Sequence, residues 1–189
     1  MVIPDNFWLS MRHFETEENK KGIYIGQQAY PICNTDINTN GHLETLDKCS
    51  VFASTLLRSK QTVDYITSTF DNVQFNVIYT DALIERGLGD FEGKSKNLAR
   101  QNKSFFIDDK FIVELTPPNG EGFVFFRNRV SLILEQIRKQ HQNSHILIIS
   151  HLQVLRMIRF CMDNNFNYSQ WHSINYSHGE VIKEHYGKK

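Results

Sequence analysis

The chain has 189 residues, of which 40% are apolar, so a single domain with a buried core can form. Lys and Arg together number 21, as do Asp and Glu, and this balance excludes a global field that would attract nucleic acid or an anionic membrane surface. Cys33, Cys49 and Cys161 are widely spaced and form no C-x-x-C pair, which indicates reduced thiols and not zinc or redox chemistry.

The predicted elements alternate between strands and helices along the chain. Residues 1–13 lack a basic stretch followed by an apolar one, and no apolar run approaches the roughly 18 residues of a membrane span, so we expect a cytoplasmic protein. Short apolar runs predict strands at 7–11, 51–54, 75–79 and 146–150. Helical spacing of apolar residues predicts helices at 56–69, 122–141 and 154–162. This alternation predicts an α/β sandwich.

Three further segments complete the predicted organisation. Residues 41–48 are expected to form a short helix that enters the second strand. Residues 180–186 alternate enough for an edge strand near the C-terminus, and such an edge can pair across a homodimer. Residues 94–116 are expected to form a short lid-like insertion. No repeat or linker divides the chain, so we expect one domain over 1–189.

Side chains suited to binding an anion follow four of the predicted strands. They are Arg12 and His13 after the first strand, Arg58 after the second, Glu85 and Arg86 after the third, and His151 after the fourth. In open α/β sheets, ligands bind beyond the carboxyl ends of the strands, so these groups should meet at one rim. Guanidinium groups match phosphate oxygens, histidine serves as nucleophile or donor, and a carboxyl group can protonate a leaving group. The sequence therefore predicts a phosphate site.

Each of these residues, taken singly, has a simpler explanation. A lone arginine is usually solvated on the surface, a lone histidine usually makes a structural hydrogen bond, and Glu85 could be a charge at a helix start. Six such residues at four strand ends would require several independent coincidences. We therefore favour the functional interpretation of the set.

Five motifs in this order resemble those of the histidine phosphatase superfamily, the phosphoglycerate-mutase-like proteins. Residues 12–19 (RHFETEEN) resemble R-H-G-E-T-x-x-N, and residues 54–62 (STLLRSKQT) resemble S-P-L-x-R-x-x-Q-T. Residues 83–93 (LIERGLGDFEG) resemble L-x-E-x-x-x-G-x-x-E-G, residues 117–121 (PPNGE) resemble P-x-G-E, and residues 148–151 (IISH) resemble the block ending in V-S-H. The resemblance covers nearly the whole chain and favours the small-metabolite phosphatase branch.

The resemblance implies a fold and a mechanism. The fold is a three-layer α/β/α sandwich with a mostly parallel sheet and one antiparallel edge strand. His13 would attack phosphorus to form a phosphohistidine, and Glu85 would protonate the leaving oxygen. Arg12, Arg58 and His151 would bind the phosphoryl oxygens. The expected enzyme is a phosphoric monoester hydrolase of the histidine acid phosphatase type that needs no metal and no cofactor, and that loses activity in acid because His13 must be neutral.

The chain departs from the family pattern at three positions next to these motifs. Phe14 stands where the family most often has glycine, so its ring is expected either to alter the backbone beside the phosphate or to wall the pocket. Thr55 replaces a proline, and Leu152 follows His151 where glycine is common. These two changes predict a more apolar pocket floor, with Leu152 facing the substrate.

Other residues are expected to face a small phosphorylated metabolite. They are Asn19, Ile23, Tyr24, Arg86 and Glu121, with Phe105 and Phe106 from the insertion and His178 from the C-terminal loop. Several have structural alternatives: Asn19 as a cap of a local turn, Glu121 as a helix-start charge, and the two phenylalanines as core residues.

Three other functions remain open from the sequence. A phosphoglycerate-type mutase is favoured by residues 83–86 (LIER), where Arg86 could bind a substrate carboxylate, but the segment that would close over the site is short. A protein phosphohistidine phosphatase and a catalytically weak phosphate-binding module are the other two. The sequence does not specify the physiological substrate, because specificity lies in loops.

Overall fold

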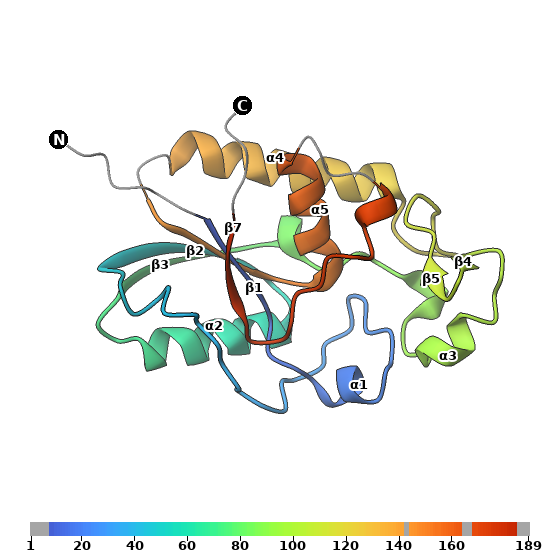
Figure 1. Cartoon of the computed structure of the whole chain (residues 1–189), viewed down its shortest axis with the longest axis horizontal. Helices are drawn as coiled ribbons and strands as arrows, with labels where there is room; N and C mark the ends of the chain where they lie inside the picture. The colour runs from blue at the N-terminus through green and yellow to red at the C-terminus, as the bar shows by residue number, and fades with distance from the viewer. Residues whose placement is uncertain (1–7, 142–143, 164–167, 185–189) are drawn as a thin grey trace.

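The computed structural model describes residues 8–141, 144–163 and 168–184 (Figure 1). Five strands form one sheet in the order β3-β2-β6-β1-β7. Their bounds are β1 Trp8–Arg12, β2 Lys48–Ser54, β3 Gln74–Thr80, β6 Ile146–Ser150 and β7 Val181–Glu184. The first four are parallel to one another, and β7 pairs antiparallel with β1. The predicted mostly parallel sheet with one antiparallel edge strand is confirmed.

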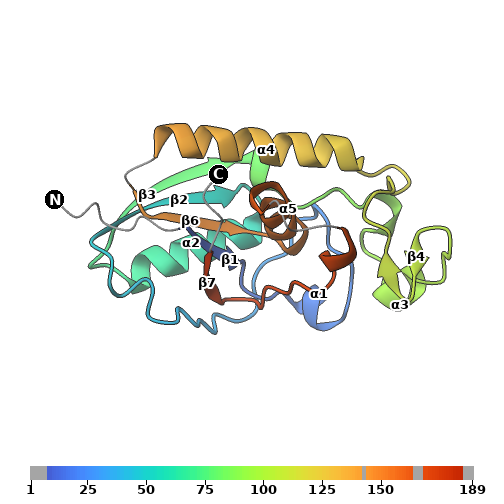
Figure 2. The ribbon, with the colours of Figure 1, turned by 45° about the horizontal axis from the view of Figure 1, so that its top comes forward.

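Helices cover both faces of the sheet. The α-helices are α1 Glu17–Lys20, α2 Leu57–Thr69, α3 Lys96–Ala99, α4 Phe123–Gln140 and α5 Leu152–Met162, and the 3-10 helices are η1 Asp81–Leu83, η2 Gly89–Phe91 and η3 Tyr168–Gln170. Helices α4 and α5 lie on one face and α2 lies on the other, which gives the three predicted layers (Figure 2). None of the described helices has both the length and the apolar character needed to cross a bilayer.

The strand β6 shows how the sequence produces these layers. It is buried throughout, and its side chains alternate between the two faces because successive residues of a strand point to opposite sides. Ile146 and Ile148 pack into the core under α4 and α5, whereas Leu147 and Ile149 pack into the core under α2. A central parallel strand is buried on both faces, which explains its continuous apolar run.

The segment between α1 and β2 corrects one expectation. Residues 41–48 form turns and bends up to position 47, and Lys48 already belongs to β2, so the predicted short helix is absent. Asn40 and Gly41 have φ values of 51° and 72°, and this left-handed backbone is incompatible with a helix start. The predicted strand residue Phe7 and the predicted end of the edge strand at 185–186 lie outside the described residues.

The segment 94–116 contains α3 and a small hairpin of β4, Phe106–Ile107, and β5, Lys110–Phe111. It lies at one end of the molecule, beyond the carboxyl ends of the strands (Figure 1). Phe106 and Phe111 are buried against Phe91 in a small core of its own, with Phe105 packed on that core. The structural alternative for the two phenylalanines, core anchoring, is therefore the correct one.

Candidate active site

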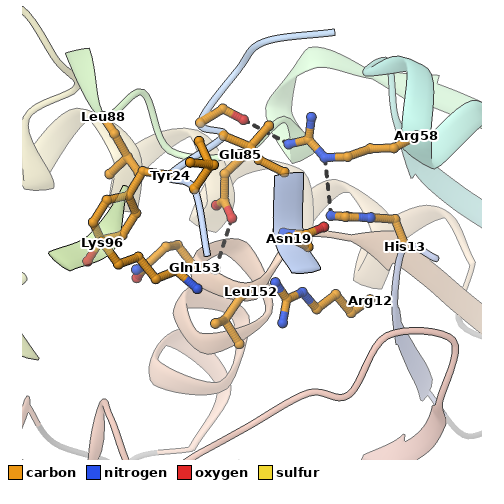
Figure 3. Close-up of a pocket in the computed structure, with 13 residues that line it drawn as sticks. Arg12, His13, Asn19, Tyr24, Arg58, Glu85, Leu88, Lys96, Leu152 and Gln153 are labelled. Atoms are coloured by element: carbon orange, nitrogen blue, oxygen red, sulfur yellow. Dashed lines mark hydrogen bonds between the residues drawn. The ribbon is translucent and has the colours of Figure 1, made fainter. Parts of the chain in front are cut away.

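A pocket of about 80 Å³ opens at the carboxyl ends of the parallel strands (Figure 3). Its lining is formed by Arg12, His13, Asn19, Ile23, Tyr24, Ile25, Gly26, Arg58, Glu85, Leu88, Lys96, Leu152 and Gln153. Four of the five predicted catalytic residues are in this set. They come from β1, the first turn of α2 and the loop after η1, so the sheet brings together residues that are up to 73 positions apart, from position 12 to position 85.

The His13 imidazole is held in one orientation. Its main-chain N–H donates to the Ser150 carbonyl over 3.0 Å, and its ring Nδ1 lies 2.6 Å from the Phe14 carbonyl. Because a carbonyl can only accept, Nδ1 carries the proton and Nε2 presents a lone pair. Burial, followed by the charges of Arg58 and Arg12, holds the pKa of His13 well below its usual value. The ring is therefore neutral at neutral pH.

The lone pair on His13 Nε2 accepts a hydrogen bond. Arg58 donates to it from Nε over 3.1 Å, and the two remaining guanidinium nitrogens donate to the carbonyls of Gln28 and Gly26, each over 2.8 Å. Arg58 is only 1% exposed, and burial lowers the pKa of its guanidinium to about 10, which leaves it charged at neutral pH. All three of its contacts are to uncharged acceptors.

The loop that supplies these carbonyls depends on a second loop. Gly26 has φ of 54°, and a Cβ placed there would lie 2.0 Å from Oε1 of Glu92. That carboxylate accepts hydrogen bonds from the main-chain N–H groups of Leu88 and Gln27, over 2.8 and 3.3 Å. Glu92 therefore ties the loop around Gly26 to the loop after Glu85.

Arg12 ends β1 and points into the same space as His13 and Glu85 (Figure 3). Its Nη1 donates to the Tyr176 carbonyl over a long 3.4 Å, and within the described part of the chain its buried Nε has no partner. Burial lowers the pKa of Arg12 to about 10, and Glu85 partly offsets this effect. Arg12 is thus a charged group whose Nε–H has no acceptor among the described residues.

Glu85 lies against the start of α5. Its Oε1 accepts from the Arg86 main-chain N–H over 2.9 Å, and its Oε2 accepts from the Gln153 N–H over 3.4 Å. The pKa of Glu85 is nevertheless raised, because burial outweighs these bonds and the charges of Arg58 and Arg12. A raised pKa is suited to a carboxyl group that donates a proton.

His151 lies directly before α5 and is not among the residues that line the pocket. Its ring centroid is 5.0 Å from that of His13, and its Nε2 is 2.8 Å from the Ser54 hydroxyl. Its buried Nδ1 has no hydrogen-bond partner among the described residues. The Ser54 oxygen accepts from the Leu56 N–H and can donate its own proton to Nε2, which would leave Nδ1–H as an unused donor.

The predicted substrate-facing residues divide into two groups. Asn19, Ile23, Tyr24 and Leu152 line the pocket. Asn19 also fulfils its structural alternative, because its amide oxygen accepts from the Thr16 N–H and the Thr16 hydroxyl caps α1. The Phe14 ring does not wall the pocket: it is fully buried in the core under α2, edge-on to Tyr65 at 5.2 Å between centroids.

Two predicted substrate contacts need correction. Arg86 is 0% exposed, and its three guanidinium nitrogens donate to the carbonyls of Glu121, Val113 and Leu115 over 2.7–3.1 Å. The Glu121 carboxylate pairs with Arg129 at 2.6 Å and accepts from the Gly87 N–H. Neither side chain lines the pocket. Arg86 and Glu121 therefore join the segment 94–116 to α4 and do not face a substrate.

Two polar residues that sequence reasoning missed line the pocket. Lys96 comes from α3, and its side-chain ammonium makes no hydrogen bond or ion pair within the described chain, while burial and Arg12 lower its pKa. Gln153 lies in the first turn of α5, and the Trp171 indole N–H fixes its amide oxygen over 3.0 Å. The sequence could have indicated Gln153, because it lies two residues after His151 at the start of a helix. Nothing in the sequence indicated that Lys96 would line the pocket.

The family model for the histidine phosphatase superfamily (branch 1) matches residues 8–188. The chain belongs to this superfamily. An adenosylcobalamin/alpha-ribazole phosphatase of Escherichia coli (strain K12) is 30% identical over 159 residues, which cover 80% of this chain and 75% of that protein. A metal-independent phosphoserine phosphatase of Arabidopsis thaliana is 30% identical over 162 residues, covering 78% and 65%.

The fold of this histidine phosphatase is also found in solved structures. Bacillus stearothermophilus YhfR superposes with a TM-score of 0.76 at 22% identity, covering 92% of this chain and 87% of that chain. At this identity the likeness establishes the fold. The assignment made from the five motifs, to the superfamily and to its small-metabolite phosphatases, is confirmed by the family match and by the named relatives.

Proposed function

We propose that this histidine phosphatase is a metal-independent phosphomonoester hydrolase that acts on a small phosphorylated metabolite through a phosphohistidine on His13. One observation carries the proposal. His13 is neutral and fixed as the Nδ1–H tautomer, and it lines a pocket together with three cationic side chains. A neutral imidazole held in this way is a nucleophile.

Binding of the phosphoryl group is assigned to Arg12, Arg58 and His151. Nε of Arg12 and Nδ1 of His151 are buried donors without a partner among the described residues, and leaving them unsatisfied is unfavourable until an acceptor arrives. Lys96 adds a cation at the pocket edge. The two arginines and Lys96 supply the positive charge for transition-state stabilisation that a metal ion supplies in other phosphatases.

The reaction then proceeds in two displacements. In the first, the His13 Nε2 lone pair forms a bond to phosphorus while the bond from phosphorus to the ester oxygen breaks, and protonated Glu85 gives its proton to that oxygen. In the second, the Glu85 carboxylate takes a proton from water as the water oxygen bonds to phosphorus and the N–P bond breaks. Phosphate leaves, and His13 and Glu85 return to their starting forms. The raised pKa of Glu85 supports its role as the acid.

The pocket supports a small substrate. Its volume of about 80 Å³ corresponds to between two and three water molecules at about 30 Å³ each, which accommodates a phosphoryl group and little more. The rest of the substrate would lie across the rim formed by Tyr24, Leu88 and Leu152. A cytoplasmic location is part of this proposal and is supported by the three free thiols.

The test is phosphate release from a panel of small phosphomonoesters in the presence of a chelator. His13→Asn should abolish release, whereas His172→Asn, which changes a half-buried histidine bonded to the Phe111 carbonyl, should not. Isomerisation of 3-phosphoglycerate that exceeds hydrolysis would replace the proposal by a mutase. Equal turnover by wild type and His13→Asn would refute the phosphohistidine.

A further inference from the structure

The chain segment before β7 crosses the end of β1 beside the proposed nucleophile. The Gly179 N–H donates to the Arg12 carbonyl over 3.1 Å, and Arg12 donates from Nη1 to the Tyr176 carbonyl. Between these two contacts, Nδ1 of His178 lies 2.8 Å from the His13 carbonyl. A third histidine thus contacts His13, while its neighbours Tyr176 and Gly179 hold Arg12.

The protonation state of His178 follows from its partner. Because the His13 carbonyl can only accept, Nδ1 of His178 carries a proton. Burial, followed by the charge of Arg12, lowers the pKa of His178 to about 3. His178 therefore remains a neutral, constant donor at neutral pH, and proton transfer is not its role.

Two histidine rings pack against the His13 ring. The His178 ring centroid is 5.1 Å from that of His13 with the planes inclined by 59°, and the His151 centroid is 5.0 Å away on a 56° incline. The His13 carbonyl bonded to His178 belongs to the same peptide unit whose N–H, on Phe14, donates to the Thr62 hydroxyl over 3.0 Å. The peptide that follows His13 is thus fixed at both its oxygen and its nitrogen.

This peptide also determines where the nucleophile points. The His13 ring hydrogen bonds to the carbonyl of Phe14, which lies in the next peptide, so a rotation of the 13–14 peptide that changes φ of Phe14 moves the acceptor that orients the ring. A misplacement of about 1 Å at a reacting atom costs up to about a hundredfold in rate. Loss of the His178 bond would therefore act on Nε2 through the backbone.

We propose that His178 is a positioning residue for phosphoryl transfer: it fixes the peptide after His13 and packs on the His13 ring, so that Nε2 is aimed at phosphorus. The inference rests on the proposed function and assigns no direct contact with the substrate. It predicts an effect on the rate of phosphorylation of His13 and not on binding of the phosphate group.

The experiment compares His178→Ala, His178→Asn and the control His172→Ala. The asparagine amide nitrogen can take the place of Nδ1 as donor, so it should rescue the function that alanine removes. His172 lies on the same C-terminal segment, is also half-buried and also bonds a carbonyl, but it contacts the segment 94–116 and not His13. The substrate is p-nitrophenyl phosphate, and rapid quenching measures formation of acid-labile phosphoenzyme.

We expect His178→Ala to slow phosphoenzyme formation about tenfold or more, with KM within about twofold and Tm close to that of wild type. His178→Asn should recover most of the rate, and His172→Ala should match wild type. Affinity for orthovanadate, which mimics the transition state at His13, should fall in parallel in His178→Ala, whereas affinity for inorganic phosphate should not.

Several outcomes would overturn the inference. An unchanged rate in His178→Ala would do so, as would a rate equally low in the alanine and asparagine variants. A loss of rate explained by a matching fall in Tm would reduce His178 to a structural residue. If wild-type protein forms no phosphoenzyme and binds no vanadate, the proposed function has failed, and this result differs from every failure of the positioning role alone.

Discussion

The Nε–H of Arg58 donates to Nε2 of His13 over 3.1 Å, so the lone pair assigned to attack on phosphorus is held by an arginine in the resting protein. An incoming phosphoryl oxygen is a better acceptor for that N–H than the neutral imidazole, because its negative charge attracts the charged guanidinium and two oxygens can accept from the fork at once. Substrate binding would thereby release the nucleophile. The contact is suited to keep His13 both neutral and aligned until then.

Replacing Arg58 by lysine should test this relationship. Lysine keeps the charge but lacks the planar fork that reaches His13, Gly26 and Gln28 at once, so we expect kcat/KM to fall about 10²- to 10³-fold. The matched control is Arg127→Lys on the exposed face of α4, which should behave as wild type. Steady-state kinetics with p-nitrophenyl phosphate would measure both, and equal losses in the two variants would contradict the assignment.

A pair of glycine variants separates the effect of backbone strain from that of a steric clash. Both Gly26 and Gly22 have positive φ, but a Cβ at Gly22 meets nothing within 4 Å, whereas one at Gly26 overlaps the Glu92 carboxylate. Gly22→Ala should cost about 1–2 kcal/mol in stability, a fall in Tm of about 2–8 °C, with little change in kcat. Gly26→Ala should lower both Tm and kcat, because the Gly26 carbonyl holds Arg58. Equal kcat values in Gly22→Ala and Gly26→Ala would show that the Glu92 contact does not affect the site.

The pH dependence of kcat should have an unusually low acid limb. His13 has a lowered pKa, so it stays neutral as pH falls below 6.5 and is lost as nucleophile only when pH approaches its shifted value. The expected fall in activity under acid therefore begins well below pH 6.5. Measuring kcat at saturating substrate keeps the ionisation of free substrate out of the profile. An acid limb centred at or above pH 6.5 would show that His13 is not buried beside these arginines in solution.

Glu85→Gln should lower kcat and raise Tm, and the gain in Tm should depend on pH. The folded-state pKa of Glu85 is raised above 4.5, so the ionised carboxylate destabilises the folded protein at pH values above the raised pKa, and this penalty disappears as pH falls toward 4.5. The Tm of Glu85→Gln relative to wild type should therefore increase with pH from 4.5 upward. We expect kcat to fall about 10²- to 10⁴-fold, since the acid is lost. A Tm difference that is constant with pH would contradict the raised pKa.

Arg86→Lys distinguishes a structural arginine from a substrate contact. Lysine would leave at least one of three buried carbonyls without its donor, at a cost of about 1–3 kcal/mol each, so Tm should fall by several degrees. The KM of the folded protein should stay within about twofold. A tenfold rise in KM at unchanged Tm would instead restore the role in substrate binding that the sequence suggested.

Much of the sheet could be predicted because burial on both faces imposes a continuous apolar run. The bounds of β6 match the prediction, since Ile146 follows a polar histidine and Ser150 precedes another. The strand β2 begins earlier than predicted because Lys48 and Cys49 extend the pairing with β3 beyond the apolar run. The turns at 40–41 were missed because left-handed backbone at Asn40 leaves no apolar pattern.

The site residues could be predicted where their position at the end of a strand determines which way the side chain points. Arg12 and His13 stand at the carboxyl end of β1. The carboxyl ends of all parallel strands lie at one edge of the sheet, so residues that follow these strands meet there. Glu85 and Arg86 lie after a 3-10 turn, where no periodicity indicates which of two adjacent side chains points into the pocket. Arg86 turned out to face the other way, toward the carbonyls of the segment 94–116.

The uncharged partners of Arg58 have a consequence for turnover. Two carbonyls and a neutral imidazole fix the Arg58 guanidinium without neutralising it, and Arg12 and Lys96 line the same pocket. The pocket lining therefore holds three cationic side chains against one carboxylate, that of Glu85. Inorganic phosphate presents the same oxygens as the group that has just been cleaved, so the product competes for the pocket by the forces that recruit the substrate. The turnover rate of such an enzyme would follow the ratio of ester to free phosphate in its surroundings. Dissociation of phosphate would then limit the rate when free phosphate is abundant.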